Sequence, residues 1–325
     1  MEHLVRAALV AVSLSAGVVH AQAVGKYPAK PVRIVVGYAP GGGADIVGRI
    51  VAQKLTEAFG QSFVVDNRPG ASATIATEFA ARAAPDGYTL SLGVPTSHSV
   101  LPSLWRGRLN YDPLQDFAPI TMLGTSPLLL AVHPSLPVRT VRDLIAVARA
   151  RPGQLTFGAG GIGTPPHMAG ELFKQTAGVD MLLVAYKGEA PAITDLLGGQ
   201  ISLIFSNVTA VLPHVRANKL RGIAVTALER VPAAPELPTV AESGLPGFEI
   251  ESWYGLLAPA RTPHEIVMRL HDETVRTLNQ PDAKQRIEAL GLVVKTTTPE
   301  QLAIYMQEQV AKWAKVVKAS GAKAD

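Results

Sequence analysis

A glycine-rich turn between an apolar run and an amphipathic run constrains the fold of this chain more than any other segment. It reads Tyr38-Ala39-Pro40-Gly41-Gly42-Gly43-Ala44-Asp45 and joins the strand-like residues 32–37 to a helix-like run over 46–59. Glycines at such a junction let a ligand or another backbone segment approach closely, because no Cβ lies in the way. The following helix N-terminus presents unpaired N–H groups and the positive end of its dipole, which favour a bound carboxylate or phosphate. A plain turn with a helix cap is the alternative for this segment taken alone.

The rest of the chain alternates short apolar runs with runs of helical spacing. The apolar runs are continuous, as is typical of parallel strands covered on both faces. They are Val32–Tyr38, Phe63–Asn67, Tyr88–Val94, Leu128–Val132, Leu155–Phe157, Met181–Tyr186, Ile201–Phe205 and Gly222–Thr226. Helices are expected over Ile46–Phe59, Val141–Ala150, Met168–Gln175, Pro263–Asn279, Pro281–Leu290 and Pro299–Ala319, the last three opened by proline. This pattern predicts an α/β protein with parallel sheets.

The first 23 residues are expected to be a signal peptide that lies outside the fold. Arg6 precedes an apolar run over 7–19, and small residues suited to signal peptidase follow it. The run is too short to serve as a permanent membrane anchor. The chain has no cysteine, which excludes disulfides, thiolate metal sites and a lipid-modified N-terminal cysteine. Together these features predict a protein of the bacterial periplasm.

Charge and motif content argue against two large functional classes. The 30 Lys and Arg and 26 Asp and Glu residues give a formal net charge of +4, and they are scattered along the chain. A nucleic-acid-binding role would require a basic stripe interleaved with aromatic residues. The chain also has no nucleophile elbow, zinc-protease helix, P-loop lysine or calcium loop. We therefore expect no nucleic-acid partner, no metal, no cofactor and no catalysis.

Two long apolar segments are interpreted as passages between domains. They are Ala118–Val132 and Ser252–Pro259. Two passages mean that the chain leaves the first domain, builds a second and returns. We therefore predict a discontinuous domain 1 over 24–124 and 248–325, and a domain 2 over 125–247. Two domains joined by two crossover segments form a hinged cleft that closes around a ligand.

A second glycine-rich loop, 158–164, has two interpretations. Gly158, Gly160 and Gly163 match the dinucleotide-binding pattern, so an exported nucleotide-dependent enzyme is an alternative function. Pro165 and Pro166 count against it, because a dinucleotide-binding helix would already be running there and would need their N–H groups. We favour two glycine loops that face each other across the cleft. Thr164 would then cap the second helix, and His167 in its first turn could donate to an anion, although both have equally plausible structural roles.

Many motifs in one order then match a known family. They are Tyr27-Pro28, Lys30-Pro31, residues 39–43 with Asp45, 66–71, 85–90, 111–113, 116–119, 161–164 with His167, 186–188, 238–239 and 253–259. In these motifs, from about Tyr27 to the C-terminus, the chain resembles the Bug-type extracytoplasmic solute receptors, the substrate-binding proteins of tripartite tricarboxylate transporters.

The resemblance implies a two-domain periplasmic binding protein of type II-like, flytrap architecture. It implies a small organic carboxylate ligand and delivery to the membrane permease subunits of such a transporter, by a receptor expected to be a monomer. Presentation of the loaded receptor to a sensor kinase is the alternative. Mapped by motif, the ligand-binding residues are Tyr38, Pro40, Gly41, Gly42, Gly43, Ala44 and Asp45 in the first loop, Ala159, Gly161, Ile162, Gly163, Thr164 and His167 in the second, and Ser206 with Asn207.

Three departures from the family pattern concern the second domain. Ala159 and Ile162 stand where the family often has Ser and Asn, and Ser206 stands where Asp is common. An Asp at that place could pair with a ligand ammonium group. Its absence predicts a di- or tricarboxylate, or another organic acid, in preference to an amino acid.

Overall fold

The computed structural model describes residues 27–41, 43–186, 188–289 and 291–320, so the predicted signal peptide over 1–23 lies outside it. The strands are β1 Val32–Val36, β2 Phe63–Asn67, β3 Thr89–Gly93, β4 Phe117–Val132, β5 Thr156–Ala159, β6 Leu182–Ala185, β7 Leu203–Asn207, β8 Arg221–Val225 and β9 Glu251–Pro259. The α-helices are α1 Gly43–Phe59, α2 Thr74–Ala81, α3 Leu101–Leu104, α4 Val141–Ala150, α5 Pro165–Ala177, α6 Glu189–Leu197, α7 Val208–Arg216, α8 His264–Leu278, α9 Pro281–Glu288 and α10 Pro299–Ser320. A 3₁₀ turn, Ala71–Ala73, and a π-helical turn, Thr96–Val100, complete these elements. Among these residues no helix combines the length and apolarity that a membrane crossing requires.

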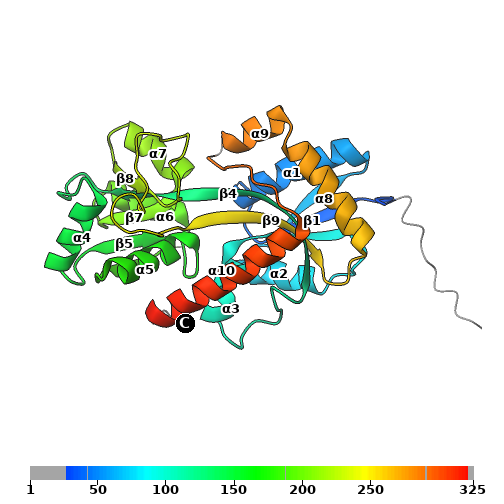
Figure 1. The fold of residues 1–325 in the computed structure, drawn as a ribbon, viewed down its shortest axis with the longest axis horizontal. Helices are drawn as coiled ribbons and strands as arrows, with labels where there is room; N and C mark the ends of the chain where they lie inside the picture. Colours follow the sequence, from blue (N-terminus) through cyan, green and yellow to red (C-terminus); the bar gives the residue numbers. More distant parts are fainter. Residues whose placement is uncertain (1–26, 42, 187, 290, 321–325) are drawn as a thin grey trace, which may run out of the picture.

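The molecule has two lobes connected by β4 and β9 (Figure 1). We call the part with β1–β3, α1, α2, α8 and α9 the first lobe, and the part with β5–β8 and α4–α7 the second lobe. In the first lobe the strand order is β2-β1-β3-β9-β4, with β1, β2 and β3 parallel. In the second lobe β6, β5 and β7 are parallel, and β4 pairs with both β7 and β8. This α/β architecture agrees with the expected fold class.

Strand β4 belongs to both sheets. It runs antiparallel to β9 from Phe117 to Pro127, and antiparallel to β7 and β8 from about Leu128 to Val132. The prediction of parallel strands is therefore wrong for β4 and β8, and β9, which was predicted only as a passage between domains, is also antiparallel to its neighbours. Residues 128–132 are fully buried, and a strand buried on both faces has the same continuous apolar sequence in either direction. Hydrophobicity alone could not have given the direction of the strand.

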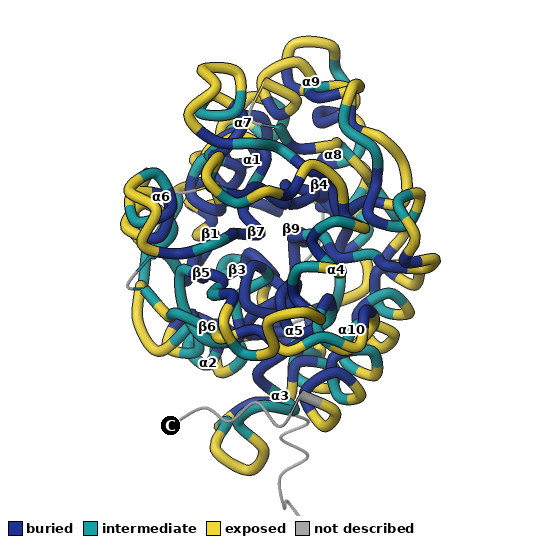
Figure 2. The backbone as a smooth tube through the Cα atoms, turned by 90° about the vertical axis from the view of Figure 1, so that its left-hand side faces the viewer, coloured by how far each residue is buried: buried dark blue, intermediate teal, exposed yellow. Residues whose placement is uncertain are grey.

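Each lobe has its own apolar core around its sheet. In the first lobe Ile34 and Leu90 pack with residues of α1 and α8. In the second lobe Phe173 of α5 lies 5.8 Å from Phe205 of β7, measured between ring centroids. Figure 2 shows strands β1, β3, β5, β7 and β9 as buried inside an outer layer of helices and loops with exposed faces. The strands can therefore hold the loops at their ends in fixed positions.

Helix α10 packs against the cores of both lobes and runs diagonally beneath β4 and β9 (Figure 1). Near its start, Leu302 and Met306 are buried with Trp253 of β9. Near its end, Trp313 and Val316 join the cluster around Phe157 of the second lobe. The division into 24–124 with 248–325 and 125–247 stays a prediction, and α10 is the element whose assignment depends most on where a boundary is drawn.

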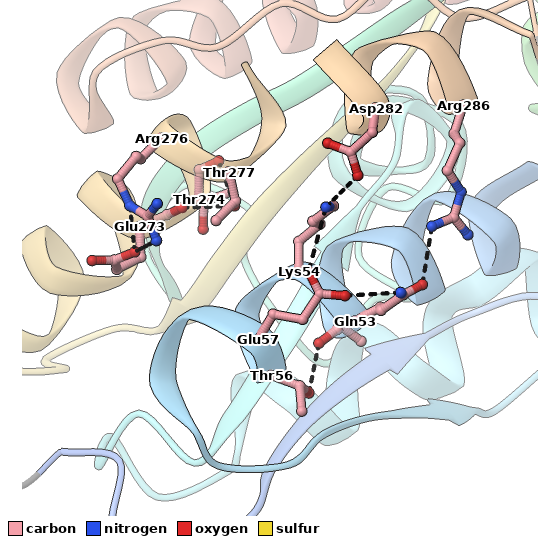
Figure 3. Close-up of polar contacts among 11 residues, drawn as sticks. Gln53, Lys54, Thr56, Glu57, Glu273, Thr274, Arg276, Thr277, Asp282 and Arg286 are labelled. Atoms are coloured by element: carbon pink, nitrogen blue, oxygen red, sulfur yellow. Dashed lines mark hydrogen bonds and ion pairs between the residues drawn. The ribbon is translucent and has the colours of Figure 1, made fainter. Parts of the chain in front are cut away.

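Helix α1 is held in place by α9 through polar contacts at its C-terminal half (Figure 3). Lys54 Nζ lies 2.5 Å from Asp282 Oδ2 and 3.3 Å from Glu57 Oε2. Arg286 donates a 3.0 Å hydrogen bond to Gln53 Oε1. Lys54 is buried, whereas Asp282 and Glu57 are exposed to solvent, which screens these pairs and keeps the contribution of each to stability small. Together they orient the helix whose N-terminus follows the first glycine loop.

Candidate functional site

A cavity of about 370 Å³ lies where loops of the two lobes meet. Its size falls within the ordinary range for small-molecule sites. The first lobe contributes the turn after β1, the start of α1 and the segment after β3. The second lobe contributes the turns before α5 and α6 and the end of β7, and β9 supplies two side chains. The lining residues are Tyr38, Ala39, Pro40, Gly43, Ala44, Val94, Pro95, Thr96, Gly160, Thr164, Pro165, Pro166, Gly188, Glu189, Asn207, Ser252 and Tyr254.

Asp45 holds the first glycine loop from inside the protein. Its side chain is buried, and Oδ2 accepts hydrogen bonds of 2.9 Å from both Gly41 N and Arg49 Nε. Oδ1 accepts a 2.9 Å hydrogen bond from Asn67 Nδ2, which also donates to the carbonyl oxygen of Tyr38. The carboxylate therefore has protein partners on both oxygens. It positions the loop and does not line the cavity.

The charge of Asp45 is stabilised by these donors. Burial raises the pKa of the carboxyl group, but the hydrogen bonds from Arg49, Gly41 and Asn67 outweigh burial and leave the pKa below its ordinary value. Gly41 has a φ of +88°, a conformation that favours glycine. The turn is thus fixed by a buried anion and one obligatory glycine, with the start of α1 open to the cavity.

Tyr254 places its hydroxyl group beside this loop. A Cβ added to Gly43 would lie 3.2 Å from Tyr254 Oη, and no described residue is its hydrogen-bond partner. Burial is the main cause of the raised pKa of Tyr254, with smaller contributions from Tyr38 and Glu189, so the phenol stays protonated at neutral pH. Tyr38, by contrast, donates a 3.0 Å hydrogen bond to Thr96 Oγ1. The Tyr254 hydroxyl group, which has no hydrogen-bond partner among the described residues, and the first N–H groups of α1 can therefore donate to a ligand.

The second glycine loop is close to the turn that precedes α6. The Gly188 N–H donates a 3.1 Å hydrogen bond to the carbonyl oxygen of Gly160. A Cβ on Gly160 would lie 2.8 Å from Gly188 C and from Glu189 N, so only glycine permits this approach. The hydrogen bond and the close contact fix Glu189 at the cavity wall.

Thr164 and His167 stabilise the second loop. Thr164 is the N-cap residue of α5, and its hydroxyl donates a 2.7 Å hydrogen bond to the Gly161 carbonyl oxygen. His167 is buried, and its Nδ1 accepts a 3.0 Å hydrogen bond from Gly163 N. Burial, with a smaller contribution from the charge of Lys174, lowers the pKa of His167 to about 4. His167 is therefore neutral, and its Nδ1 supports the second loop, which is the structural one of the two roles that the sequence left open.

Glu189 is the acidic side chain of the cavity wall. Its carboxylate accepts a hydrogen bond from the Ser206 hydroxyl group and one of 2.9 Å from Asn207 N. The Asn207 side-chain amide lies 3.2 Å from both carboxylate oxygens. These donors come from the end of β7 and connect two neighbouring turns of the second lobe.

The structure brings six of the predicted site residues to the cavity wall: Tyr38, Pro40, Gly43, Ala44, Thr164 and Asn207. Gly42 lies outside the described residues. Eight predicted site residues do not line the cavity, although most of them support loops that do. They are Gly41, Asp45, Ala159, Gly161, Ile162, Gly163, His167 and Ser206. Ala159 and Ser206 are fully buried in strands, so their side chains act on the cavity only through neighbours.

Sequence reasoning missed four polar side chains of the wall: Thr96, Glu189, Ser252 and Tyr254. A signal for Glu189 was present, because it follows an apolar run and a glycine and begins an amphipathic run, as the first loop does. Tyr254 and Ser252 lie in the apolar crossing segment, and no ligand-binding role was predicted for either, although Tyr254 belongs to the family motif 253–259. The place of Thr96 depends on its contact with Tyr38, 58 residues away in the sequence.

Comparison with known proteins identifies the family of this chain. Residues 47–322 match the family model described as the tripartite tricarboxylate transporter family receptor. The chain belongs to this receptor family. The protein BugT of Bordetella pertussis is 34% identical over 309 residues, which cover 95% of this chain and 95% of BugT.

Solved members of the receptor family share the fold. A protein of R. palustris determined with adipate is 38% identical, with a TM-score of 0.82 over 91% of this chain and 98% of that one. MatC from Rhodopseudomonas palustris, determined with bound malate, is 32% identical, with a TM-score of 0.78 over 90% of this chain and 100% of MatC. The two-domain periplasmic binding protein fold expected from the sequence is confirmed.

Proposed function

We propose that this family member is a periplasmic receptor that binds a small organic carboxylate in the cavity between its lobes and delivers it to the permease subunits of a tripartite tricarboxylate transporter. On this proposal residues 1–23 direct export, the protein acts as a monomer, and it catalyses no reaction. The hinge consists of the crossing strands β4 and β9, between a domain formed by 24–124 with 248–325 and a domain formed by 125–247. The adipate and malate found in solved relatives support a carboxylate as the ligand class.

The observation that carries this proposal is the donor set of the first lobe. The cavity meets the start of α1, where the first N–H groups have no helical partner and the dipole is positive. Tyr254 adds a hydroxyl donor beside Gly43. Such fixed donors bind a carboxylate without an arginine or lysine. We therefore propose that a ligand carboxylate binds between Pro40 and Ala44, next to Tyr254.

The finer ligand prediction rests on side chains of the second lobe. The sequence favours a di- or tricarboxylate, or another organic acid, over an amino acid, because Ser206 provides no carboxylate. Glu189, which accepts the Ser206 hydrogen bond, supplies an acidic group at the same place. The preference for a second ligand carboxylate therefore loses its physical basis, although an organic acid as such remains the proposed ligand.

Thermal-shift and calorimetric titration of the full chain test the receptor proposal. We compare NAD with adipate, malate, other organic acids and amino acids. A ligand raises the melting temperature by mass action only if it binds the folded state, so the shift identifies which class of compound binds. Two variants of nearly equal size, Ala39→Asp and Ala39→Asn, differ in charge and test where the carboxylate binds. Ala39 is suited to this test because it is exposed and lines the cavity. We expect Asp to abolish carboxylate binding by repulsion and Asn to retain it. Binding of NAD alone, or equal affinities in the two variants, would contradict the proposal.

Delivery is tested separately in cells. Deletion of the receptor gene should stop uptake of the identified ligand, and re-expression of the unchanged chain should restore it. Unchanged uptake together with loss of a transcriptional response to the ligand would instead favour presentation to a sensor kinase.

A further inference from the structure

The carboxylate of Glu189 is held in one orientation by residues outside its own helix. Glu189 begins α6 but makes no capping hydrogen bond there; its partners are the Ser206 hydroxyl group and the Asn207 backbone and side chain. Asn207 is the N-cap residue of α7, yet its side chain makes no cap hydrogen bond and instead donates to Glu189. Ser126 of β4 in turn donates a 3.4 Å hydrogen bond to Asn207 Oδ1. The Ser206 and Asn207 side chains and the Asn207 backbone N–H thus fix one carboxylate at the cavity wall, and Ser126 supports the Asn207 side chain.

This carboxylate has no cationic partner among the described residues that line the cavity. That part of the wall contains no Lys, Arg or His side chain, and Glu189 is its one acidic side chain. Asp45 of the other lobe is a different case, because Arg49 lies 2.9 Å from it and pairs with its charge. The described wall is therefore polarised, with helix N–H donors in the first lobe and a fixed negative charge in the second.

The second loop is also poorly suited to a second ligand carboxylate. Helix α5 begins with Pro165 and Pro166, which line the cavity and have no N–H groups to donate. The Thr164 hydroxyl group donates to the Gly161 carbonyl oxygen. The N-terminus of α5 thus presents apolar rings where α1 presents N–H groups. The two lobes are not equivalent anion sites.

We propose that Glu189 is the specificity-determining residue of the cleft and that the ligand carries one carboxylate and, at its other end, an ammonium group. This inference rests on the proposed function, because it assumes that the ligand carboxylate occupies the first lobe. Closure of the cleft removes water from Glu189, which is unfavourable for an ionised group unless a cation pairs with it. A second carboxylate would meet a like charge, and such repulsion selects against the wrong ligand. The expectation drawn from Ser206 is thereby reversed.

Matched ligand pairs test this inference by calorimetry on the full chain. The diacids succinate, glutarate and adipate are compared with γ-aminobutyrate, δ-aminopentanoate and ε-aminohexanoate, which have the same number of carbons but carry a CH2–NH3+ group in place of one carboxylate. We expect the preferred amino acid to bind about tenfold or more tightly than the diacid with the same number of carbons. Equal or tighter binding of the diacids by the unchanged chain would overturn the inference.

The variants are Glu189→Gln and the control Glu236→Gln, an exposed residue of the second lobe that does not line the cavity. Glu189→Gln should lower the affinity for the amino acid by about tenfold or more and leave or raise the affinity for the diacid. An equal loss for both ligands, or a matching loss in the control, would mean that Glu189 only supports the loop. If Ala39→Asp fails to abolish binding of either class, or if no carboxylate binds, the receptor proposal itself fails. A diacid preference with an intact first site contradicts the Glu189 inference alone.

Discussion

The backbone N–H of Gly41 donates a 2.9 Å hydrogen bond to Asp45 Oδ2, four residues further along the chain. The same oxygen accepts from Arg49 Nε, so one buried atom connects the glycine turn to the first turns of α1. The turn is consequently held in one conformation by the protein's own side chains. A pre-organised loop loses less conformational entropy on binding than a mobile one.

Asp45→Asn should destabilise the protein at neutral pH. The neutral amide loses charge-assisted hydrogen bonds from Gly41 and Arg49, and we expect the free energy of unfolding to fall by about 2 kcal/mol. Because the folded-state pKa of Asp45 lies below its ordinary value of 3.8, the contribution is present above that value and is lost as pH falls through the folded-state pKa. Urea unfolding of the unchanged chain and of Asp45→Asn at neutral and acidic pH measures this contribution to the free energy of unfolding. A difference that stays constant with pH would contradict the assigned role.

Gly160→Ala should disturb the wall that carries Glu189. The new Cβ would lie 2.8 Å from Gly188 C and Glu189 N, and backbone atoms cannot move aside as a flexible side chain can. We expect a loss of about 1–3 kcal/mol in the free energy of unfolding, together with weaker ligand binding. Gly198→Ala is the control, because Gly198 has a φ of −82° and the nearest atom would be 3.6 Å away. Similar losses in the two variants would argue against the close contact.

Tyr254→Phe isolates the phenol hydroxyl group beside Gly43. No described residue accepts or donates a hydrogen bond with this group, so its removal should leave the melting temperature of the free protein nearly unchanged. A carboxylate bound at the first lobe would lose one donor, and the ligand affinity should fall by about tenfold. Calorimetry of the two proteins measures this change. Unaltered affinity would place the carboxylate elsewhere in the cavity.

The buried histidines should make the protein less stable in mild acid. Burial lowers the pKa of His167 to about 4 from an ordinary value of 6.5, and His98 shifts in the same direction for the same reason. Between pH 4 and pH 6.5 the unfolded chain binds more protons than the folded protein. The contribution of these neutral histidines to the free energy of unfolding is therefore fully present above pH 6.5 and falls as pH decreases toward 4. Each histidine should cost about 2 kcal/mol of unfolding free energy between pH 7 and pH 5.

His167→Asn separates titration from hydrogen bonding. The side-chain oxygen of the introduced asparagine can still accept the hydrogen bond from Gly163 N, but asparagine binds no proton between pH 5 and pH 7. The variant should therefore show a smaller loss of stability between pH 7 and pH 5 than the unchanged chain. Denaturant unfolding at the two pH values measures the slope, and an unchanged slope would show that His167 is not the titrating group.

The local patterns of the sequence predicted most elements of the fold. Strand β2 has the predicted bounds, and α1 and α8 differ from them by a few residues at one or both ends. Local patterns report burial and helix signals, and these depend on neighbouring residues. Strand direction in β4, β8 and β9 was not predictable in this way, because a fully buried strand shows the same apolar run whichever way its partner points.

The sequence by itself determined the class of this protein: its α/β alternation, its two glycine loops, the crossings near 118–132 and 252–259, and the motifs of a solute receptor family. Only the tertiary structure decided which side chains meet in the cavity. Asp45 and His167 turn inward to hold their loops, whereas Glu189 and Tyr254 reach the cavity wall. The reason is physical. A side chain's role depends on partners that are distant in the sequence, such as Asn67 for Asp45 in the first lobe and Ser206 for Glu189 in the second, and their approach is fixed only when the strands and helices of each lobe pack.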